Sequence, residues 1–266
     1  MTKVRIITGL ILGLSVGAFI GWAPLPLFNA VLLIVLSLAA YEFFCITLPH
    51  PSLGFFWAML LTILLSILFL FFPAPPMLPL FAGVLLLCLS FYLFQKQDPA
   101  LAVKQASLTL LGVFYISILF SHVGLIRALP QGVMWVYVLL ASTFLADSGA
   151  YLVGHMIGRH KLAPRISPGK TVEGLVGGVF FSLIATLIVK IFFWRYLSLW
   201  DCLIVGCISG LVGPLGDLSE SLIKRSVNLK DSGRLIPGHG GVLDRVDALL
   251  FTAPVVYYYA KYLKGF

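Results

Sequence analysis

The most constraining feature of this chain is its succession of long apolar runs, because a helix needs about 20 apolar residues to cross a bilayer. Only 11% of the 266 residues are charged, whereas a soluble domain carries about 25%. We therefore predict an all-α, polytopic integral membrane protein, a single transmembrane domain over residues 1–266 with a polar cavity facing the cytoplasm. Hydropathy predicts about nine transmembrane helices, at residues 5–22, 26–47, 53–72, 77–95, 105–128, 133–157, 173–195, 199–226 and 244–263.

The positive charges of the chain indicate how these helices are oriented. The net charge is +8, but the cations gather in the loops between apolar runs rather than in one nucleic-acid-binding patch. With the N-terminus in the cytoplasm, 13 of the 18 Lys and Arg residues fall on the cytoplasmic side, as the positive-inside rule requires. We therefore predict membrane lipids and no nucleic acid as partners. The predicted location is a bacterial-type inner membrane, multi-pass, with the N-terminus and the polar loops cytoplasmic.

The chemistry of the chain concentrates near its end. Residues 217–247 hold five of the ten Asp and Glu residues, together with five cations. Asp244 and Asp247 are three residues apart and share a face of the last predicted helix. One face of the preceding helix carries residues spaced at i, i+3, i+4 and i+7, which are Asp217, Glu220, Ser221 and Lys224.

Three segments rich in glycine and proline adjoin these acids. Residues 236–241 cannot lie inside a helix and suit a backbone that turns sharply and approaches a ligand closely. Residues 165–174 predict a chain break and then a helix that begins at Lys170, and a helix N-terminus beside a lysine is an anion site. The glycines around Pro214 predict a broken helix that opens space for metal and lipid phosphate, which we favour over a groove for helix packing.

Two acids interrupt apolar runs, where a carboxylate costs about 2.5–3.5 kcal/mol to insert. Glu42 either pairs with a cationic or polar group of another helix or lies near the cytoplasmic end of its own. Asp147 either forms a polar wall of the substrate cavity or makes a structural hydrogen bond between helices, and the small residues 148–150 permit close helix approach. Residues 1–130 otherwise offer no chemistry, so we expect them to be structural and residues 131–266 to be catalytic.

The polar end of the chain also carries a long ungapped motif. It reads Ser221-x-Ile223-Lys224-Arg225, then Lys230-Asp231-x-Gly233, then Ile236-Pro237-x-His239-Gly240-Gly241-x-x-Asp244-Arg245-x-Asp247. With Asp147-Ser148-Gly149-Ala150 and Ser167-Pro168-Gly169-Lys170-Thr171, this motif resembles the phosphatidate cytidylyltransferases (CDP-diacylglycerol synthases) over about residues 140–250. That family commonly has threonine at position 148 and lysine at position 169, so Lys170 is the remaining candidate for a phosphate contact there.

The resemblance implies that CTP and phosphatidic acid react to give CDP-diacylglycerol and pyrophosphate for phospholipid biosynthesis. Carboxylates from two helix ends suit Mg²⁺, as one or two divalent or mixed ions, because it takes oxygen ligands shared with substrate phosphates. The expected metal ligands are Asp217, Asp244 and Asp247. The expected catalytic residues are Asp217, Ser221, Lys224, Arg225, Lys230, Asp231, His239, Asp244 and Asp247. The expected binding residues are Ser167, Lys170, Thr171, Gly240, Gly241 and Arg245.

Two other functions are compatible with parts of this pattern. A CTP-using lipid or polyprenol kinase, or a synthase acting on an ether-lipid phosphate, would need a similar set of charges, and a kinase would release CDP instead of pyrophosphate. An ion-coupled transporter would use Asp147 and Asp217 as cation sites within the membrane, but it has little need for the His-Gly-Gly turn. A homodimer is a possible assembly.

Overall fold

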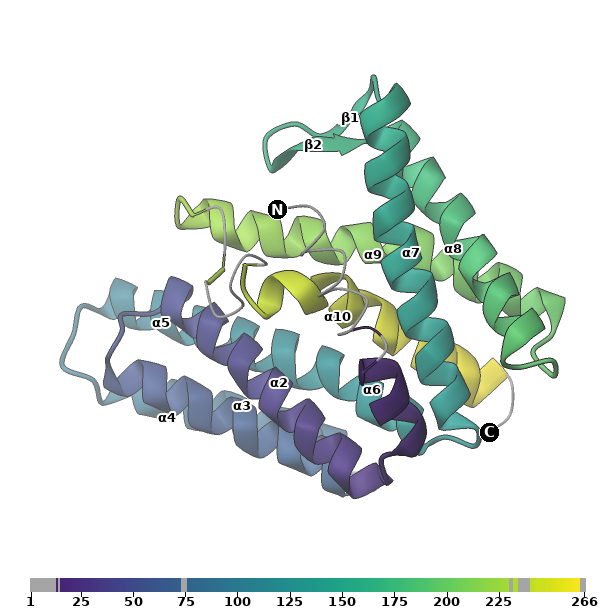
Figure 1. Ribbon diagram of the computed structural model, residues 1–266. Helices are drawn as coiled ribbons and strands as arrows, with labels where there is room; N and C mark the ends of the chain where they lie inside the picture. The colour runs from purple at the N-terminus through teal and green to yellow at the C-terminus, as the bar shows by residue number, and fades with distance from the viewer. Residues whose placement is uncertain (1–12, 14, 73–75, 230–231, 234–239, 264–266) are drawn as a thin grey trace.

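The computed structural model describes residues 13, 15–72, 76–229, 232–233 and 240–263, and these form a helical membrane protein (Figure 1). Residues 15–22 are helical. The labelled helices are α2 (Leu25–Thr47), α3 (Leu53–Phe71), α4 (Met77–Leu93), α5 (Pro99–Gly112), α6 (Leu119–Ala128), α7 (Gly132–Ile157), α8 (Val172–Phe192), α9 (Leu199–Ser226) and α10 (Leu243–Tyr258), with π-helical segments η1 (Val113–Ile118) and η2 (Tyr259–Leu263).

Six helical stretches in the described part of the chain are long and apolar enough to cross a membrane. They are Leu25–Thr47, Leu53–Phe71, Pro99–Ala128, Gly132–Ile157, Val172–Phe192 and Leu199–Ser226. This confirms the polytopic all-α class but not the count of nine. α4 is apolar but shorter, with 17 residues, and α10 has 16 residues with the charges of Asp244 and Asp247 in its first turns.

Helix α10 lies between the two halves of the molecule (Figure 1). It packs against α9 and α7 of the second half and against α6 and α2 of the first half. Its buried side chains, among them Leu243 and Leu250, belong to the same hydrophobic core as Phe43 and Phe44 of α2. The start of α10 is therefore held from both sides.

Helices α7 and α8 pack closely because glycines line their contact, as the small residues after Asp147 predicted. A β-carbon on Gly149 of α7 would lie 2.5 Å from the Phe181 side chain of α8, and one on Gly177 would lie 2.5 Å from Val153. Contacts this short leave room only for hydrogen at the glycine α-carbon. Helices α7 and α8 therefore form a closely packed wall beside α9.

Three boundaries differ from those expected from the sequence. α5 begins at Pro99 instead of residue 105, because the Asp98 carboxylate accepts the N–H groups of the first helical turn. The segment between α7 and α8 is an antiparallel hairpin of β1 (Lys161–Ala163) and β2 (Ser167–Thr171). Lys170 therefore lies in a strand, and Thr171 caps α8, accepting the Gly174 N–H at 3.1 Å.

The predicted break in α9 is wrong, because the helix continues through Pro214. Its glycines instead make room for neighbouring helices. A β-carbon on Gly210 would lie 2.4 Å from the Val179 α-carbon of α8, and one on Gly216 would lie 2.3 Å from the carbonyl oxygen of Asp247 in α10. The glycine spacing of α9 therefore reflects a groove for helix packing, the second of the two interpretations.

Candidate active site

A cavity of about 730 Å³ lies where α7, the β1–β2 hairpin, α9 and α10 meet. This volume is typical of small-molecule sites. Asp147 of α7 lines the cavity and is exposed within it, which agrees with the first of its two interpretations. The residues expected from the sequence that contribute to its wall are Ser167, Lys170, Thr171, Asp217, Asp244 and Asp247.

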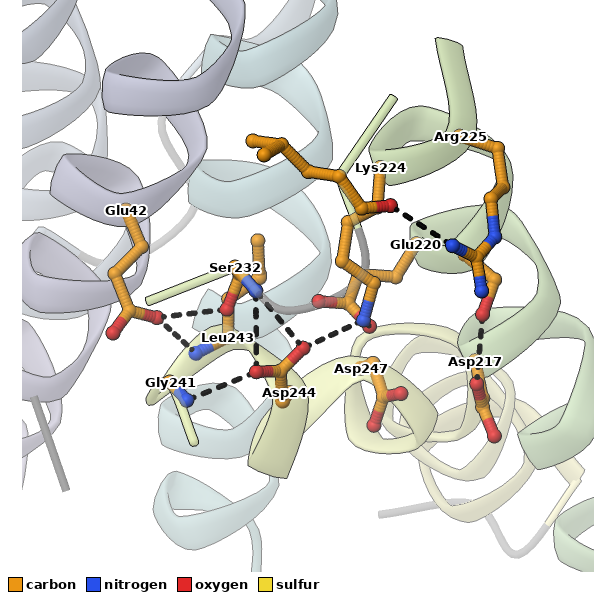
Figure 2. A network of polar contacts seen from close by, with 12 residues as sticks. Glu42, Asp217, Glu220, Lys224, Arg225, Ser232, Gly241, Leu243, Asp244 and Asp247 are labelled. Carbon is orange, nitrogen blue, oxygen red and sulfur yellow. Dashed lines mark hydrogen bonds and ion pairs between the residues drawn. The ribbon is translucent and has the colours of Figure 1, made fainter. Parts of the chain in front are cut away.

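Helix α9 presents its polar face to this site, as the residue spacing predicted (Figure 2). Lys224 Nζ lies 2.8 Å from Glu220 Oε2, one helical turn away. The Ser221 hydroxyl donates to Asp217 Oδ1 at 3.3 Å. Glu220 is 1% exposed and Lys224 8% exposed, so this ion pair is shielded from water.

Asp244, in the first turn of α10, has donors on both of its carboxylate oxygens. Lys224 Nζ lies 2.6 Å from Oδ1. The backbone N–H of Gly241 donates to Oδ2 at 2.9 Å, and that of Ser232 donates at 3.3 Å. Gly240, the residue before Gly241, adopts φ = +83°, a conformation that glycine reaches without strain. Asp244 therefore links Lys224 to the loop that precedes α10.

Three other carboxylates form a group that could hold a metal ion. One oxygen from each of Asp217, Glu220 and Asp247 lies within 4.8 Å of the others. Glu220 Oε1 is buried and has no hydrogen-bond partner among the described residues. Gly216 brings the two helix backbones together beside this group. This group contains Glu220, which was not among the ligands expected from the sequence, together with Asp217 and Asp247, which were.

Lys170 reaches the same group from the hairpin. Its Nζ lies 2.6 Å from Asp217 Oδ2 and donates to the Pro214 carbonyl at 3.2 Å. The ammonium is partly exposed and lines the cavity. Lys170 therefore places a cation at the cavity wall beside the carboxylates, and its contact with an anionic ligand stays a prediction.

Several expected site residues lie elsewhere. Arg225 is exposed and donates to the carbonyls of Ile166 and Leu229 instead of facing the cavity. Arg245 is also exposed and is not among the residues that line the cavity. Lys230, Asp231 and His239 lie outside the described residues.

The structure also brings Glu42, a residue of the first half of the chain, next to the site. The Glu42 carboxylate of α2 reaches the loop before α10, where Oε2 accepts from the Ser232 hydroxyl at 3.2 Å and from the Leu243 N–H at 2.8 Å. This supports pairing with a polar group of another element, the first of its two interpretations. A carboxylate in an apolar run was the only signal in the sequence, and it could not name the partner.

Comparison with known proteins gives a consistent result. Residues 3–263 match the sequence profile of the Cytidylyltransferase family. The chain is 43% identical to a phosphatidate cytidylyltransferase of Staphylococcus saprophyticus and 44% identical to one of Staphylococcus aureus (strain COL), over 151 residues in each case. It is 45% identical over 147 residues to an Escherichia coli protein named as uncharacterized protein YnbB.

These pairwise matches cover part of each protein. The staphylococcal matches span 57% of this chain and 57% of each relative. The match to the Escherichia coli protein spans 53% of this chain and 49% of that protein. The family profile, by contrast, extends over nearly the whole chain.

Proposed function

The chain belongs to the cytidylyltransferase family, and we propose that it transfers a cytidylyl group from CTP to phosphatidic acid, giving CDP-diacylglycerol and pyrophosphate. Two relatives named phosphatidate cytidylyltransferase support this substrate pair. The observation that carries the proposal is the cavity in which Lys170 and the carboxylates of α9 and α10 meet. Such a site can hold several phosphate groups together with a divalent cation.

The reaction forms one phosphorus–oxygen bond and breaks another. A non-bridging oxygen of the phosphatidate attacks the α-phosphorus of CTP. The bond from that phosphorus to the oxygen bridging to the β-phosphate breaks, and pyrophosphate leaves with the electron pair. The phosphate monoester is itself the nucleophile, so the protein needs no covalent intermediate. Ser221, which donates to Asp217, is a hydrogen-bonding residue in this scheme.

The carboxylate group fits Mg²⁺ by its chemistry, because all of its donors are oxygen atoms. Octahedral Mg²⁺ with bonds of about 2.1 Å places its ligand oxygens about 3 to 4.2 Å apart, close to the spacing of this group. We propose that Asp217, Glu220 and Asp247 hold the ion. Asp244 can join them only if its ion pair with Lys224 breaks. When bound, the ion offsets the negative charge of the two substrates and aligns their oxygens.

The remaining roles follow from the positions of the cations. Lys170 borders the cavity and can contact a substrate phosphate while it keeps its ion pair with Asp217. Lys224 is buried between Glu220 and Asp244, so its proposed role is to hold these two acids in place. Arg225, Lys230, Asp231, His239 and Arg245 stay predictions for phosphate or loop contacts.

The membrane orientation is part of the same proposal. Residues 158–171 and 224–245 carry nine of the 13 Lys and Arg residues that follow residue 130, and positive loops face the cytoplasm. This orientation lets cytosolic CTP enter the cavity while the lipid phosphate arrives from the bilayer. We propose a bacterial-type inner membrane location with the N-terminus on the cytoplasmic side.

The test is product analysis with the purified full-length chain in detergent. Labelled CTP, phosphatidic acid and Mg²⁺ should give CDP-diacylglycerol and pyrophosphate in equal amounts. Asp217→Asn and Asp244→Asn should each lower the rate about 10- to 100-fold, the usual effect of changing a residue that supports a metal site. Asp98→Asn, an exposed helix cap outside the cavity, is the matched control and should keep the wild-type rate.

Release of CDP with a phosphorylated lipid would indicate a kinase and contradict the proposal. Full activity in both Asp217→Asn and Asp244→Asn would contradict the assigned site.

A further inference from the structure

Glu42 is an acid of the N-terminal half whose side chain reaches the segment that leads into α10, beside the candidate active site. It is 2% exposed, and Figure 2 shows its carboxylate pointing from α2 toward the loop before α10. A buried carboxylate is costly unless it is hydrogen-bonded. Oε2 accepts from the Ser232 hydroxyl and from the Leu243 N–H, so the cost is offset at one specific point of the chain.

That point is the N-terminus of α10, which lacks a local cap. Residue Val242 occupies the capping position, and its isopropyl side chain cannot accept a hydrogen bond. The Leu243 N–H, the first of the helix, instead donates to Glu42 Oε2 at 2.8 Å. An anionic group is also favourable at the positive end of a helix. Glu42 therefore supplies from another helix the cap that the loop sequence does not provide.

The loop is built to let this carboxylate approach. A β-carbon on Gly241 would lie 2.5 Å from Glu42 Oε2 and 2.1 Å from the Ser232 hydroxyl oxygen. A β-carbon on Gly233 would lie 2.6 Å from Glu42 Oε1. Each of these distances is below 3.0 Å, so a side chain at position 233 or 241 would force Glu42 or Ser232 out of the positions described here.

The contact between Glu42 and Ser232 is linked by further hydrogen bonds and ion pairs to the carboxylates of α9 and α10. Ser232, whose hydroxyl contacts Glu42, donates its backbone N–H to Asp244. Asp244 pairs with Lys224, and Lys224 pairs with Glu220. These contacts form one connected polar network from α2 to the carboxylate group (Figure 2). A shift at its α2 end would displace the first turn of α10 and the two acids that it carries.

We propose that Glu42 is a positioning residue for the active site: it fixes the loop and the start of α10 so that Asp244 and Asp247 face α9. It touches no substrate in this role. The consequence for catalysis rests on the proposed cytidylyl transfer, whereas the anchoring of the loop does not. The two can therefore be tested separately on the same variants.

The matched variants are Glu42→Ala, Glu42→Gln and Asn29→Ala. Asn29 lies on the same helix, is 4% exposed and donates to the Leu70 carbonyl in the first half. Its loss removes a buried polar contact of similar kind without touching the loop. Glu42→Gln keeps an oxygen acceptor for the Leu243 N–H but loses the charge.

The first measurement is hydrogen–deuterium exchange of the full chain in detergent, read on peptides that cover residues 240–248 at the start of α10. Glu42→Ala should raise exchange there at least tenfold, a factor that corresponds to about 1.4 kcal/mol. Glu42→Gln should fall between Glu42→Ala and the wild type, and Asn29→Ala should match the wild type. Unchanged exchange in Glu42→Ala would overturn the anchoring.

The second measurement is the Mg²⁺ dependence of cytidylyl transfer, normalised to folded protein. Glu42→Ala should lower kcat about 10- to 100-fold, the usual effect of losing a residue that supports metal ligands, and should raise the Mg²⁺ concentration for half activity. The KM for CTP should change little.

A folded Glu42→Ala protein with wild-type kcat and Mg²⁺ dependence would show a merely structural role and overturn the catalytic part. A wild-type protein without transfer activity would contradict the proposed function, and exchange alone would then decide the anchoring.

Discussion

The carboxylates of α9 and α10 are chemically alike but have different neighbours. Asp244 pairs with Lys224 and accepts from backbone N–H groups, whereas Asp217, Glu220 and Asp247 bring oxygens within 4.8 Å of one another, with Lys170 and Lys224 at the edge of the group. Like charges at this distance repel unless a cation or a proton lies among them. The neighbours of each acid, more than its residue type, separate the ligand group from the acid that orders the loop.

Lys224 is buried and pairs with two acids at once, Glu220 and Asp244, so its removal should be severe. We expect Lys224→Met to destabilise the folded protein by about 3–5 kcal/mol, because it leaves Glu220 and Asp244 without their shared cation. A denaturant titration in detergent measures this change. The neighbouring Arg225→Met is the matched control: Arg225 is exposed, so its loss should stay within about 0.5 kcal/mol. Equal losses in the two variants would contradict the buried role of Lys224.

Residue spacing predicted the shared face of α9 but not which acids meet. Glu220 lies on that face, and its place in the carboxylate group depends on how α10 docks against α9. Asp244 and Asp247 are about one turn apart, and no local pattern separates their roles. The ion pair between Lys224 and Asp244 joins residues 20 positions apart, which a local pattern does not encode.

At the scale of elements, the contact between α9 and α10 determines the site. Gly216 lets the backbone of α9 approach the Asp247 carbonyl beside the carboxylates. Gly213, one turn earlier, has more room: a β-carbon there would lie 3.6 Å from the Thr252 side chain, an ordinary contact. The two glycines look equivalent in the sequence, but only Gly216 lies where the helix backbones touch.

This difference predicts a contrast between two small substitutions. Gly216→Ala should separate α9 from α10, destabilise the protein by about 1–3 kcal/mol and lower transfer activity on the order of 100-fold, since displacements of about 1 Å have such effects. Gly213→Ala should leave both nearly unchanged. Activity assays and unfolding of the two proteins, prepared in parallel, provide the comparison. Similar behaviour of the two variants would mean that the helix contact does not set the site.

Element types followed from the sequence more readily than their ends. Apolar length predicted the membrane helices because bilayer thickness fixes it. The hairpin of residues 161–171 is short and polar, so no periodicity distinguished it from a loop. Pro214 suggested a break, but close packing of α9 against α8 and α10 keeps the helix continuous. These outcomes depend on tertiary contacts, which local propensity does not report.

At the scale of the whole molecule, the division into a structural and a catalytic half needs refinement. α10 contacts both halves, and Glu42 of the first half caps its N-terminus. The apolar first half therefore does more than anchor the protein: it fixes one end of the polar network. Both the division at residue 130 and the possible homodimer stay predictions.

We infer that the packing of both halves around α10 creates a cation site from α9 and α10. Binding of Mn²⁺, a spectroscopic substitute for Mg²⁺, to the purified full-length chain without substrates tests it most directly. Electron paramagnetic resonance of the free ion should show saturable binding to the wild type and to Asp98→Asn. Glu220→Gln and Asp247→Asn should each weaken that binding at least tenfold, a factor equal to about 1.4 kcal/mol. Equal Mn²⁺ affinity in wild type, Glu220→Gln and Asp247→Asn would contradict the account.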